Sequence, residues 1–459
     1  MEARINIIGA IVLFLSAFLV SSATGEDLAF CLSSSGVKNF TTYYTTGDYL
    51  RLLNISIMNL RYAKPFVNKP VAVVLPGNKE QVAAAIRCST SASWTIRLRS
   101  GGHSYEGLSS RDDGPFVLID LMNMNRVSVD LDAETAWAEG GATLGEIYYA
   151  IATSSKRYGF SGGMCATVSR SGSPSDMAKL LHKWQTTANN VLEDDYFLQL
   201  AALPGSSSNQ SAELISVFFS GLYLGPKASA LAITDRVFPE LNLTAQECAE
   251  TTWAEGLIII RGDNAVRTVE DLKNRFSYQK MFTKTKFDYV ETPIPLSALE
   301  SALKMLTRQP RASVLFDVHG GAMYRIPSDA TPFPHRAGTL YGIEYFVDWP
   351  QEEDADYGVR YMKGLRRLYE FMTPFVSKNP RRSYVNSVDL DLGAIDWTDE
   401  KQLCRFDAVE VARAWGEKYF LGNYDRLVRA KTLIDPNNVF RHPQSIPPFP
   451  TKTLTRTGH

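Results

Sequence analysis

The stretch IRLRSGGHSYEG, residues 96–107, decides how the rest of the chain is interpreted. Its first residues predict a strand that ends at Arg99, and the Ser-Gly-Gly turn at 100–102 has little side-chain bulk. Backbone N–H groups in such a turn can face a phosphate or a flavin at close range. His103 would project into the same space, with Tyr105 on the same side of an extended chain. Taken alone, the pattern also fits a histidine that is satisfied within a loop.

A second pair of glycines stands in SGGMC, residues 161–165. Cys165 follows the glycines closely, so a nucleophilic sulfur could lie against a bound ligand there. A half-cystine or an inert buried thiol is the alternative for the same residue. Directly after Val168 the sequence becomes polar and rich in serine, and an amphipathic helix pattern follows.

Short elements surround these two motifs between residues 60 and 168. The patterns predict strands and helices that alternate with close glycine turns, which indicates an α+β domain. The expected strands lie at 71–75, 95–100, 116–121 and, as a pair, within 126–142, and the expected helices lie at 79–88 and 143–155.

From about Asp176 the elements lengthen. Long alternating strands with helices on one side predict an antiparallel sheet covered by helices. The expected strands are 196–203, 213–225, 256–260, 312–321 and 341–349, and the expected helices are 176–192, 295–306 and 357–372.

The composition is that of a soluble globular enzyme. The 459 residues are 45% hydrophobic and 21% charged, and 48 Lys and Arg nearly balance 49 Asp and Glu. No polybasic run is present, so we expect no nucleic-acid partner. No metal site is expected either.

The first 23 residues have the form of a secretory signal peptide. Arg4 precedes an apolar run over 7–20, and the small residues at 21–23 indicate cleavage near Ala23. An uncleaved membrane anchor is the alternative, although the run is short for a spanning helix. We expect no membrane association after the signal is removed.

Secretion implies an oxidising compartment in which cysteines pair. Of the five cysteines, at least one must remain unpaired because the number is odd. Four Asn-X-Ser/Thr triplets predict glycosylation, at Asn39, Asn54, Asn209 and Asn242.

Together these stretches resemble one family. RSGGHSYEG at 99–107 and SGGMCATV at 161–168 are similar to the berberine bridge enzyme-like family of secreted plant flavoproteins, within the vanillyl-alcohol-oxidase-like FAD superfamily. PFPHRAG at 332–338, YVNSVDLDLG at 384–393 and the segment 415–448 resemble further landmarks of the family. The resemblance covers nearly the whole mature chain.

The resemblance implies a cofactor and its contacts. FAD is usually held in this family by two covalent bonds, which fall on His103 and Cys165 of this chain. Cys31 and Cys88 match the family's disulfide, while Cys248 would be a free or buried thiol, as would Cys404. The implied cofactor-binding residues are Arg99, Ser100, Gly101, Gly102, His103, Ser104 and Cys165.

The resemblance also implies a domain plan. It predicts a signal peptide (1–23), a PCMH-type FAD-binding domain (24–168), a substrate domain (176–383) and a C-terminal segment that completes the FAD domain (384–459). The protein would be a secreted monomer of the cell wall or vacuole.

By resemblance, the chain would be an FAD-linked oxidoreductase. Its small-molecule substrate would be an alcohol, phenol, sugar or alkaloid that gives a hydride to the flavin, and dioxygen or another acceptor would take the electrons. Glu344 matches the family's active-site base, although a solvent-facing strand glutamate is the alternative. Tyr105 matches an active-site tyrosine.

Two departures from the family put activity in doubt. Ser387 and Val388 replace a tyrosine and an arginine of the C-terminal motif, and serine is too weakly acidic and too short to act as that tyrosine does. After Val168 a glycine-rich segment of several dozen residues is missing, through an alternative transcript or gene model or through a natural deletion. The missing segment would include the residue that separates an oxidase from a dehydrogenase.

The gap has physical consequences. Losing central strands would expose apolar surface and unpaired sheet edges, and it would remove phosphate-facing N–H groups. We therefore expect the domain over 24–168 to be incomplete, FAD binding to be weak or absent and the protein to be less stable. A catalytically impaired isoform or a non-catalytic secreted glycoprotein is the alternative to an active enzyme.

Overall fold

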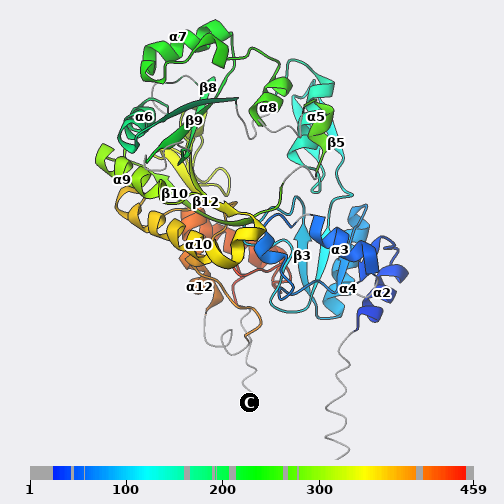
Figure 1. Ribbon diagram of the computed structural model, residues 1–459. Coiled ribbons are helices and arrows are strands. Elements are labelled where there is room, and N and C mark those ends of the chain that lie inside the picture. Colours follow the sequence, from blue (N-terminus) through cyan, green and yellow to red (C-terminus); the bar gives the residue numbers. More distant parts are fainter. Residues whose placement is uncertain are drawn as a thin grey trace, which may run out of the picture.

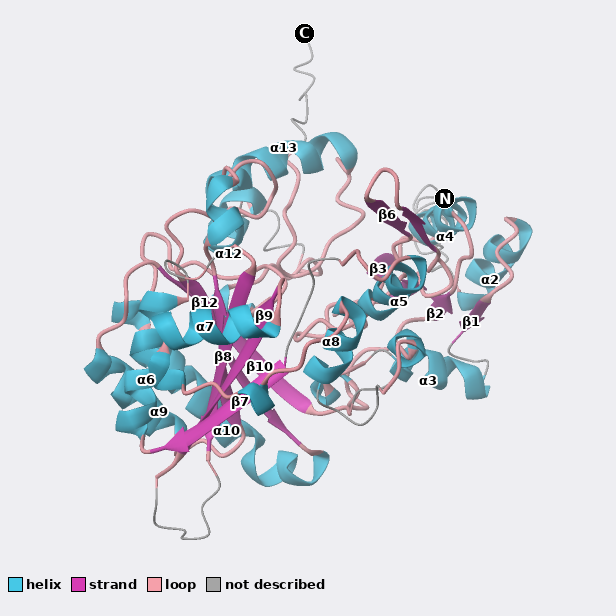
Figure 2. Cartoon of the chain, turned by 90° about the horizontal axis from the view of Figure 1, so that it is seen from above, coloured by secondary structure: helices cyan, strands magenta, loops and turns pink. Residues whose placement is uncertain are grey.

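The computed structural model contains two α+β bodies that lie side by side, which confirms the expected fold class (Figures 1 and 2). The N-terminal body is blue to cyan in Figure 1, and the larger body runs from green to orange. The structure describes residues 24–42, 46–55, 57–159, 166–188, 192, 194–205, 213–261, 267–275, 279–399 and 407–450.

The N-terminal body is built on a four-stranded sheet of order β1-β2-β4-β3. The last three strands are parallel, and β1 pairs antiparallel with β2. Every residue of β4 is buried, as expected for a central strand with both faces covered. The strands are β1 (Phe40–Thr42), β2 (Ala72–Val74), β3 (Thr95–Arg99) and β4 (Phe116–Asp120).

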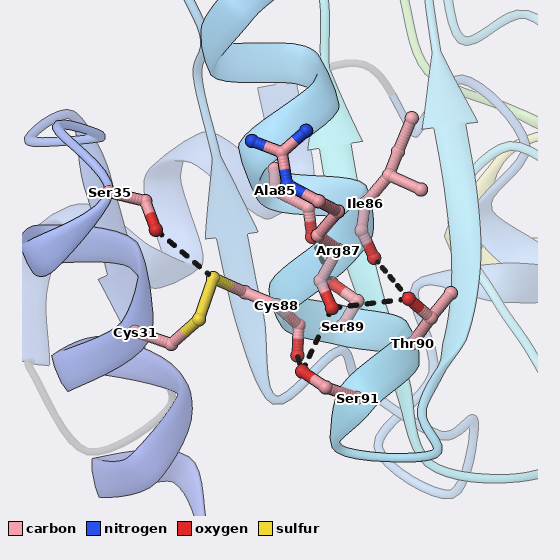
Figure 3. The surroundings of a disulfide bond; sticks show 9 residues. All are labelled: Cys31, Ser35, Ala85, Ile86, Arg87, Cys88, Ser89, Thr90 and Ser91. Atoms are coloured by element: carbon pink, nitrogen blue, oxygen red, sulfur yellow. Dashed lines mark hydrogen bonds between the residues drawn. A yellow bond between two sulfur atoms is a disulfide. The ribbon is translucent and has the colours of Figure 1, made fainter.

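Three helices cover this sheet: α2 (Gly25–Ser34), α3 (Thr46–Ile55) and α4 (Lys79–Ser91). The Asn78 side chain begins α4 by accepting a hydrogen bond from the Gln81 N–H. The predicted disulfide between Cys31 and Cys88 is confirmed and joins α2 to α4 with Cα atoms 5.8 Å apart (Figure 3). It fixes the first helix of the described chain to the sheet.

A two-stranded hairpin of β5 (Val127–Asp130) and β6 (Thr135–Ala138) stands beside helix α5 (Leu144–Ser154). In the described part of the chain, β6 pairs with β5 alone, and all four of its residues are exposed. Trp137 is 79% exposed. Within the described residues the hairpin therefore has an open strand edge that carries an exposed tryptophan.

We expect Trp137→Lys to reduce self-association of the purified protein at high concentration, because a charge replaces an apolar side chain on an open strand. The free energy of unfolding should change by only about 0.5 kcal/mol, as is usual at exposed positions. Sedimentation velocity over a concentration series measures the effect. Phe66→Lys is the matched control, since Phe66 is 80% exposed outside any strand; an equal effect of both changes would contradict a role for the hairpin.

The larger body is a six-stranded antiparallel sheet of order β10-β12-β11-β8-β9-β7. Strand β7 pairs with β9 along its whole length, so the sheet begins before the boundary expected at Asp176. The strands are β7 (Ala166–Gly172), β8 (Tyr196–Pro204), β9 (Ile215–Tyr223), β10 (Phe282–Val290), β11 (Ala312–Val318) and β12 (Tyr341–Trp349).

Helices α6 (Pro174–Thr187), α9 (Leu296–Leu306) and α10 (Asp354–Phe371) cover one face of this sheet, as the sequence predicts. Between them lies the main hydrophobic core, which includes the fully buried Trp184 and Trp349. Helix α7 (Lys227–Val237) follows β9 along the chain.

The prediction of a strand over GLIII, residues 256–260, is wrong, because this run lies in helix α8 (Trp253–Arg261). Thr252 and Glu255 form reciprocal hydrogen bonds at its start, with the Thr252 N–H donating to Glu255 Oε2 at 3.0 Å. Such a capping box satisfies the first N–H groups of a helix and outweighs the strand preference of the isoleucines.

The C-terminal segment runs from the large sheet back to the N-terminal body. After η8 (Leu390–Leu392) it forms α12 (Ala408–Phe420) and α13 (Tyr424–Ile434). Val439 then packs against the apolar cluster of the N-terminal sheet, and Arg97 of β3 donates to the carbonyl of Arg441.

Candidate active site

The face of the large sheet opposite its helices carries polar side chains at alternating positions. Gln199 on β8 donates through Nε2 to Oδ1 of Asp317 on β11. Leu315 lies opposite Glu344 of β12, so Asp317 and Glu344 share this face one diagonal step apart. The neighbouring residues of β12 point into the core instead. A partly buried pair of carboxyl groups therefore marks the open face.

Glu344 is the candidate base, and its surroundings alter its acidity. Burial raises the pKa of its carboxyl to about 7; the Ser387 hydroxyl, which donates to Oε1 at 2.8 Å, opposes the rise, and the charge of Asp317 adds to it. Glu344 therefore exchanges its proton near neutral pH, which suits a general base. Ser387 replaces the tyrosine of the family motif, and its hydroxyl still reaches this carboxyl.

Tyr105 lies over the same face. Its loop connects β3 to β4, and its ring meets that of Phe346 edge-on with centroids 6.0 Å apart. Burial, followed by the charges of Glu344 and Asp317, raises the pKa of its phenol above the usual value. The structure thus brings together Tyr105 and Glu344, which are far apart in the sequence.

His103 is exposed at the tip of the glycine turn. Ser100 and Gly101 are also exposed, and Gly102 has φ +73°, a conformation that favours glycine. A Cβ on Gly101 would lie 2.9 Å from the His103 ring, so a side chain there would displace the imidazole from this position. Ser104 accepts a hydrogen bond from the Leu108 N–H at 3.2 Å. The turn holds an uncovered imidazole two residues before Tyr105.

These residues fit the ring end of a flavin. The uncovered imidazole and the glycine turn, whose backbone has few side chains around it, could contact the ring. The carboxyl that exchanges its proton near neutral pH could act on a substrate beside the ring. Cys165, the second expected anchor, lies outside the described residues.

The side chain of Arg99 has a structural role and does not face an open site. Its side chain is fully buried and donates to Asp120 Oδ2 at 2.7 Å, and it also donates to the carbonyls of Leu52 and Leu53. Any contribution of Arg99 to a cofactor would therefore come from its backbone.

Sequence reasoning did not identify several residues of the site. Gln199 and Asp317 could have been found from strand alternation, which places them on the same face as Glu344. The ring of Tyr384 is tilted by 53° against that of Phe287, the strand neighbour of Glu344, with ring centroids 5.6 Å apart. No local signal predicts that contact, because it joins a loop to a distant strand.

Comparisons with known proteins show the family to which the chain belongs. A family model described as FAD binding domain matches residues 70–198, and one described as berberine and berberine like matches residues 383–447. Reticuline oxidase of Papaver somniferum is 40% identical over 506 residues, which cover 92% of each chain. Reticuline oxidase of Eschscholzia californica is 39% identical over 533 residues, covering 98% of this chain and 96% of the relative.

The crystal structure of berberine bridge enzyme from Eschscholzia californica superposes with a TM-score of 0.87 at 38% identity, covering 93% of this chain and 100% of that one. Both sequence alignments are longer than the 459 residues of this chain, so the relatives contain residues that it lacks. The fold and these similarities agree, and the chain belongs to the berberine bridge enzyme-like family of FAD-linked oxidoreductases.

Proposed function

We propose that this protein oxidises a small alcohol, phenol, sugar or alkaloid, with Glu344 as the general base. One observation carries the proposal: a carboxyl with a pKa of about 7 lies on the open face of the sheet together with Tyr105. A base with that pKa is half ionised at neutral pH, where it can take a proton from a substrate hydroxyl.

Each side chain has a distinct task in this scheme. FAD, when bound, supplies the hydride acceptor. Glu344 Oε2 takes the proton of the substrate hydroxyl, while Oε1 keeps the hydrogen bond from Ser387. Tyr105 packs edge-on against Phe346 and would orient the substrate beside Glu344. Burial raises the pKa of Glu344, and the charge of Asp317, which Gln199 holds in place, adds to the rise.

His103 and Cys165 are the proposed covalent anchors of FAD, with Ser100, Gly101, Gly102 and Ser104 as backbone contacts. The exposure of the His103 imidazole supports its part. Covalent attachment would fix the flavin in place even where contacts to its phosphates are few.

We expect His103→Ala in a Cys165→Ala background to abolish the flavin that stays with the protein after acid precipitation, because either change alone leaves the other proposed anchor in place. The exposed imidazole can form a bond that acid does not break, whereas non-covalent flavin is released when the chain unfolds. Absorbance of the pellet and supernatant measures the retained fraction. His182→Ala in the same Cys165→Ala background is the control, because His182 lies on α6, on the helix side of the large sheet; equal loss in both variants would contradict a specific anchor.

An alkaloid or phenol is the favoured substrate, and dioxygen the favoured acceptor, because the relatives at 39–40% identity are reticuline oxidases. Incubation of flavin-loaded protein with reticuline under air tests both points. Bleaching of the flavin followed by hydrogen peroxide formation supports an oxidase. Bleaching without reoxidation supports a dehydrogenase that uses another acceptor.

A catalytically impaired glycoprotein is the second candidate. The open β5–β6 hairpin and the residues present in the relatives but not in this chain favour it, since both are expected from an incomplete FAD domain after Val168. Flavin occupancy of the purified protein separates the two candidates, because the impaired form would be colourless and the enzyme yellow.

We further propose that the protein is secreted, through the signal peptide at 1–23, to the cell wall or vacuole. The disulfide between Cys31 and Cys88 supports an oxidising compartment. Asn39, Asn54 and Asn242 are exposed, as glycosylation requires, whereas Asn209 lies outside the described residues. No helix in the described part of the chain is both long and apolar enough to cross a bilayer.

A further inference from the structure

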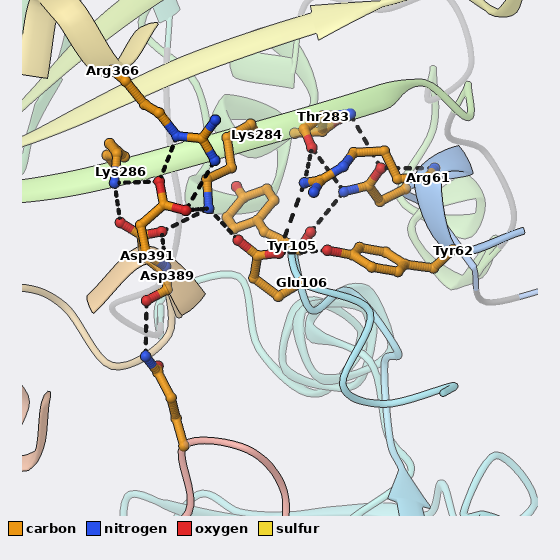
Figure 4. A network of polar contacts seen from close by, with 12 residues as sticks. Arg61, Tyr62, Tyr105, Glu106, Thr283, Lys284, Lys286, Arg366, Asp389 and Asp391 are labelled. Atoms are coloured by element: carbon orange, nitrogen blue, oxygen red, sulfur yellow. Dashed lines mark hydrogen bonds and ion pairs between the residues drawn. The ribbon is translucent and has the colours of Figure 1, made fainter. Parts of the chain in front are cut away.

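A buried polar network joins the loop that carries Tyr105 to strand β10 (Figure 4). Lys284 Nζ contacts Glu106 Oε1 and lies 2.6 Å from Asp389 Oδ1. Lys286 Nζ lies 2.5 Å from the other oxygen of Asp389. These side chains are at most 4% exposed. Charges buried so deeply persist only when they are paired, so the loop and the strand are held in one arrangement.

Asn59, which is 4% exposed, links the same loop and strand without charge. Its Nδ2 donates to the carbonyls of Tyr105 at 2.6 Å and Thr283 at 2.9 Å. Its Oδ1 accepts from the N–H groups of Thr283 and Arg61, each at 3.1 Å. All four hydrogen-bonding positions of the amide are therefore used, and they define its orientation.

The two neighbours in the loop make different contacts. Glu106 reaches Lys284 (Figure 4), whereas the Tyr105 ring packs against Phe346, which shares the open face of the sheet with Glu344. Strand β10 is paired with β12 along its whole length, and β12 carries Glu344. A rigid path thus runs from the Tyr105 backbone through Asn59 and β10 to the strand of the candidate base.

We propose that Asn59 is a positioning residue, which fixes Tyr105 over the strand pair that carries Glu344. This role rests on the proposed function of Glu344 as the base. Asn59 lies too deep to contact a substrate, so it acts only through the loop. The bond from Nδ2 to the Tyr105 carbonyl is the decisive contact, because the other bonds tie Asn59 to its own segment and to β10.

Asn59→Asp tests this link, since aspartate keeps the size and both acceptor contacts but replaces the amide that donates to the carbonyls of Tyr105 and Thr283 with an oxygen. The readout is the phenol resonance of Tyr105 in ¹³C-tyrosine-labelled protein, assigned by its loss in Tyr105→Phe. It needs neither flavin nor substrate. In the wild type this phenol should stay protonated beyond pH 10, where ordinary tyrosines titrate. In Asn59→Asp we expect its titration to shift toward that ordinary range.

Two further variants distinguish the loss of this contact from a general loss of structure. Asn59→Ala should give the same shift if it folds, as thermal melting will show. Arg366→Met removes a partly exposed member at the far end of the network, which pairs with Asp391, and it should leave the Tyr105 resonance unchanged. An unchanged Tyr105 resonance in Asn59→Asp, or an equal shift in Arg366→Met, would overturn the proposal.

Kinetics of flavin-loaded protein separate this inference from the proposed function. Asn59→Asp should slow substrate oxidation roughly ten- to a hundredfold, the usual scale for a displaced group. In a Tyr105→Phe background the same change should cause no further loss. If Glu344→Gln keeps full activity while the Tyr105 resonance shifts in Asn59→Asp, the proposed base is wrong and the positioning role stands. If Glu344→Gln is slow and Asn59→Asp changes neither readout, the positioning role is wrong.

Discussion

Glu344→Gln is expected to slow substrate oxidation by flavin-loaded protein about 10²- to 10⁴-fold, the range for loss of a general base. Glutamine keeps the size of the side chain and can still accept the hydrogen bond from Ser387. It cannot take a proton, so only the chemical step should suffer, with kcat falling while KM changes little. Rapid mixing with substrate under anaerobic conditions, monitored by flavin bleaching, measures the rate.

The rate of substrate oxidation should also depend on pH in a defined direction. Burial raises the pKa of Glu344 to about 7, so the reactive carboxylate is depleted below that pH. The rate should therefore rise with pH and level off above about 7, and this limb should be absent in Glu344→Gln. Ser387→Ala removes a hydrogen bond that lowers the pKa and should move the limb to higher pH. Asp317→Asn removes a charge that raises the pKa and should move it to lower pH.

Stability separates a lost base from a damaged fold. The pKa of Glu344 is higher in the folded protein than the ordinary value of 4.5, so ionisation of this buried carboxyl opposes folding as pH rises between the two values. At pH 8 the neutral glutamine avoids that penalty. Glu344→Gln should thus be at least as stable as the wild type in urea unfolding at pH 8, and clear destabilisation would mean that its slow rate reports unfolding.

The face on which Glu344 lies could be predicted from the sequence because its signal is local, whereas its role as the base is implied only by the family resemblance. Along β12 the residues on either side of Glu344 are apolar and pack into the core, so alternation alone turns the glutamate to the opposite face. The helices α9 and α10 are local in the same sense, since their apolar stripes match one face of the sheet. Such patterns remain valid wherever the rest of the chain lies.

The polar network could not be predicted because its partners come from distant segments. Lys284 and Lys286 alternate along β10 as solvent-facing lysines would, yet all of β10 is buried. Their partners, Glu106 and Asp389, belong to two other loops. Only the folded chain supplies opposite charges at these positions, and a strand pattern has no means of indicating that both of its faces are covered.

Arg381→Met is expected to lower the free energy of unfolding at pH 7.5 by about 3–5 kcal/mol, the scale for removing one partner of a buried ion pair. Both oxygens of Asp288, which is fully buried on β10, accept hydrogen bonds at 2.6 Å from the Arg381 guanidinium. The guanidinium also donates to the Tyr369 carbonyl at 2.8 Å, and its central carbon lies 3.5 Å from the centre of the Tyr369 ring. Methionine retains the packing but leaves the carboxylate without its partner.

The loss should depend on pH in a defined direction. Burial raises the pKa of Asp288 from its ordinary value of 3.8 to about 6 even with Arg381 in place. The carboxyl therefore contributes most to folding stability below pH 3.8, and this contribution is lost as the pH rises through 6. Without Arg381 the pKa should rise further, and the proton taken up at pH 5 should relieve part of the loss. Urea unfolding of Arg381→Met should thus show a larger deficit at pH 7.5 than at pH 5.

The double variant Asp288→Asn with Arg381→Met identifies the cause of the deficit. It removes the unpaired charge together with its partner, so most of the stability lost at pH 7.5 should return. If the double variant stays as unstable as Arg381→Met, the contacts of the guanidinium with Tyr369 and Thr373 would account for the loss instead. Recovery would mean that charge pairing joins strand β10 of the large sheet to the segment that leads to Ser387. Lys284 joins the loop of Tyr105 to the same strand in the same way.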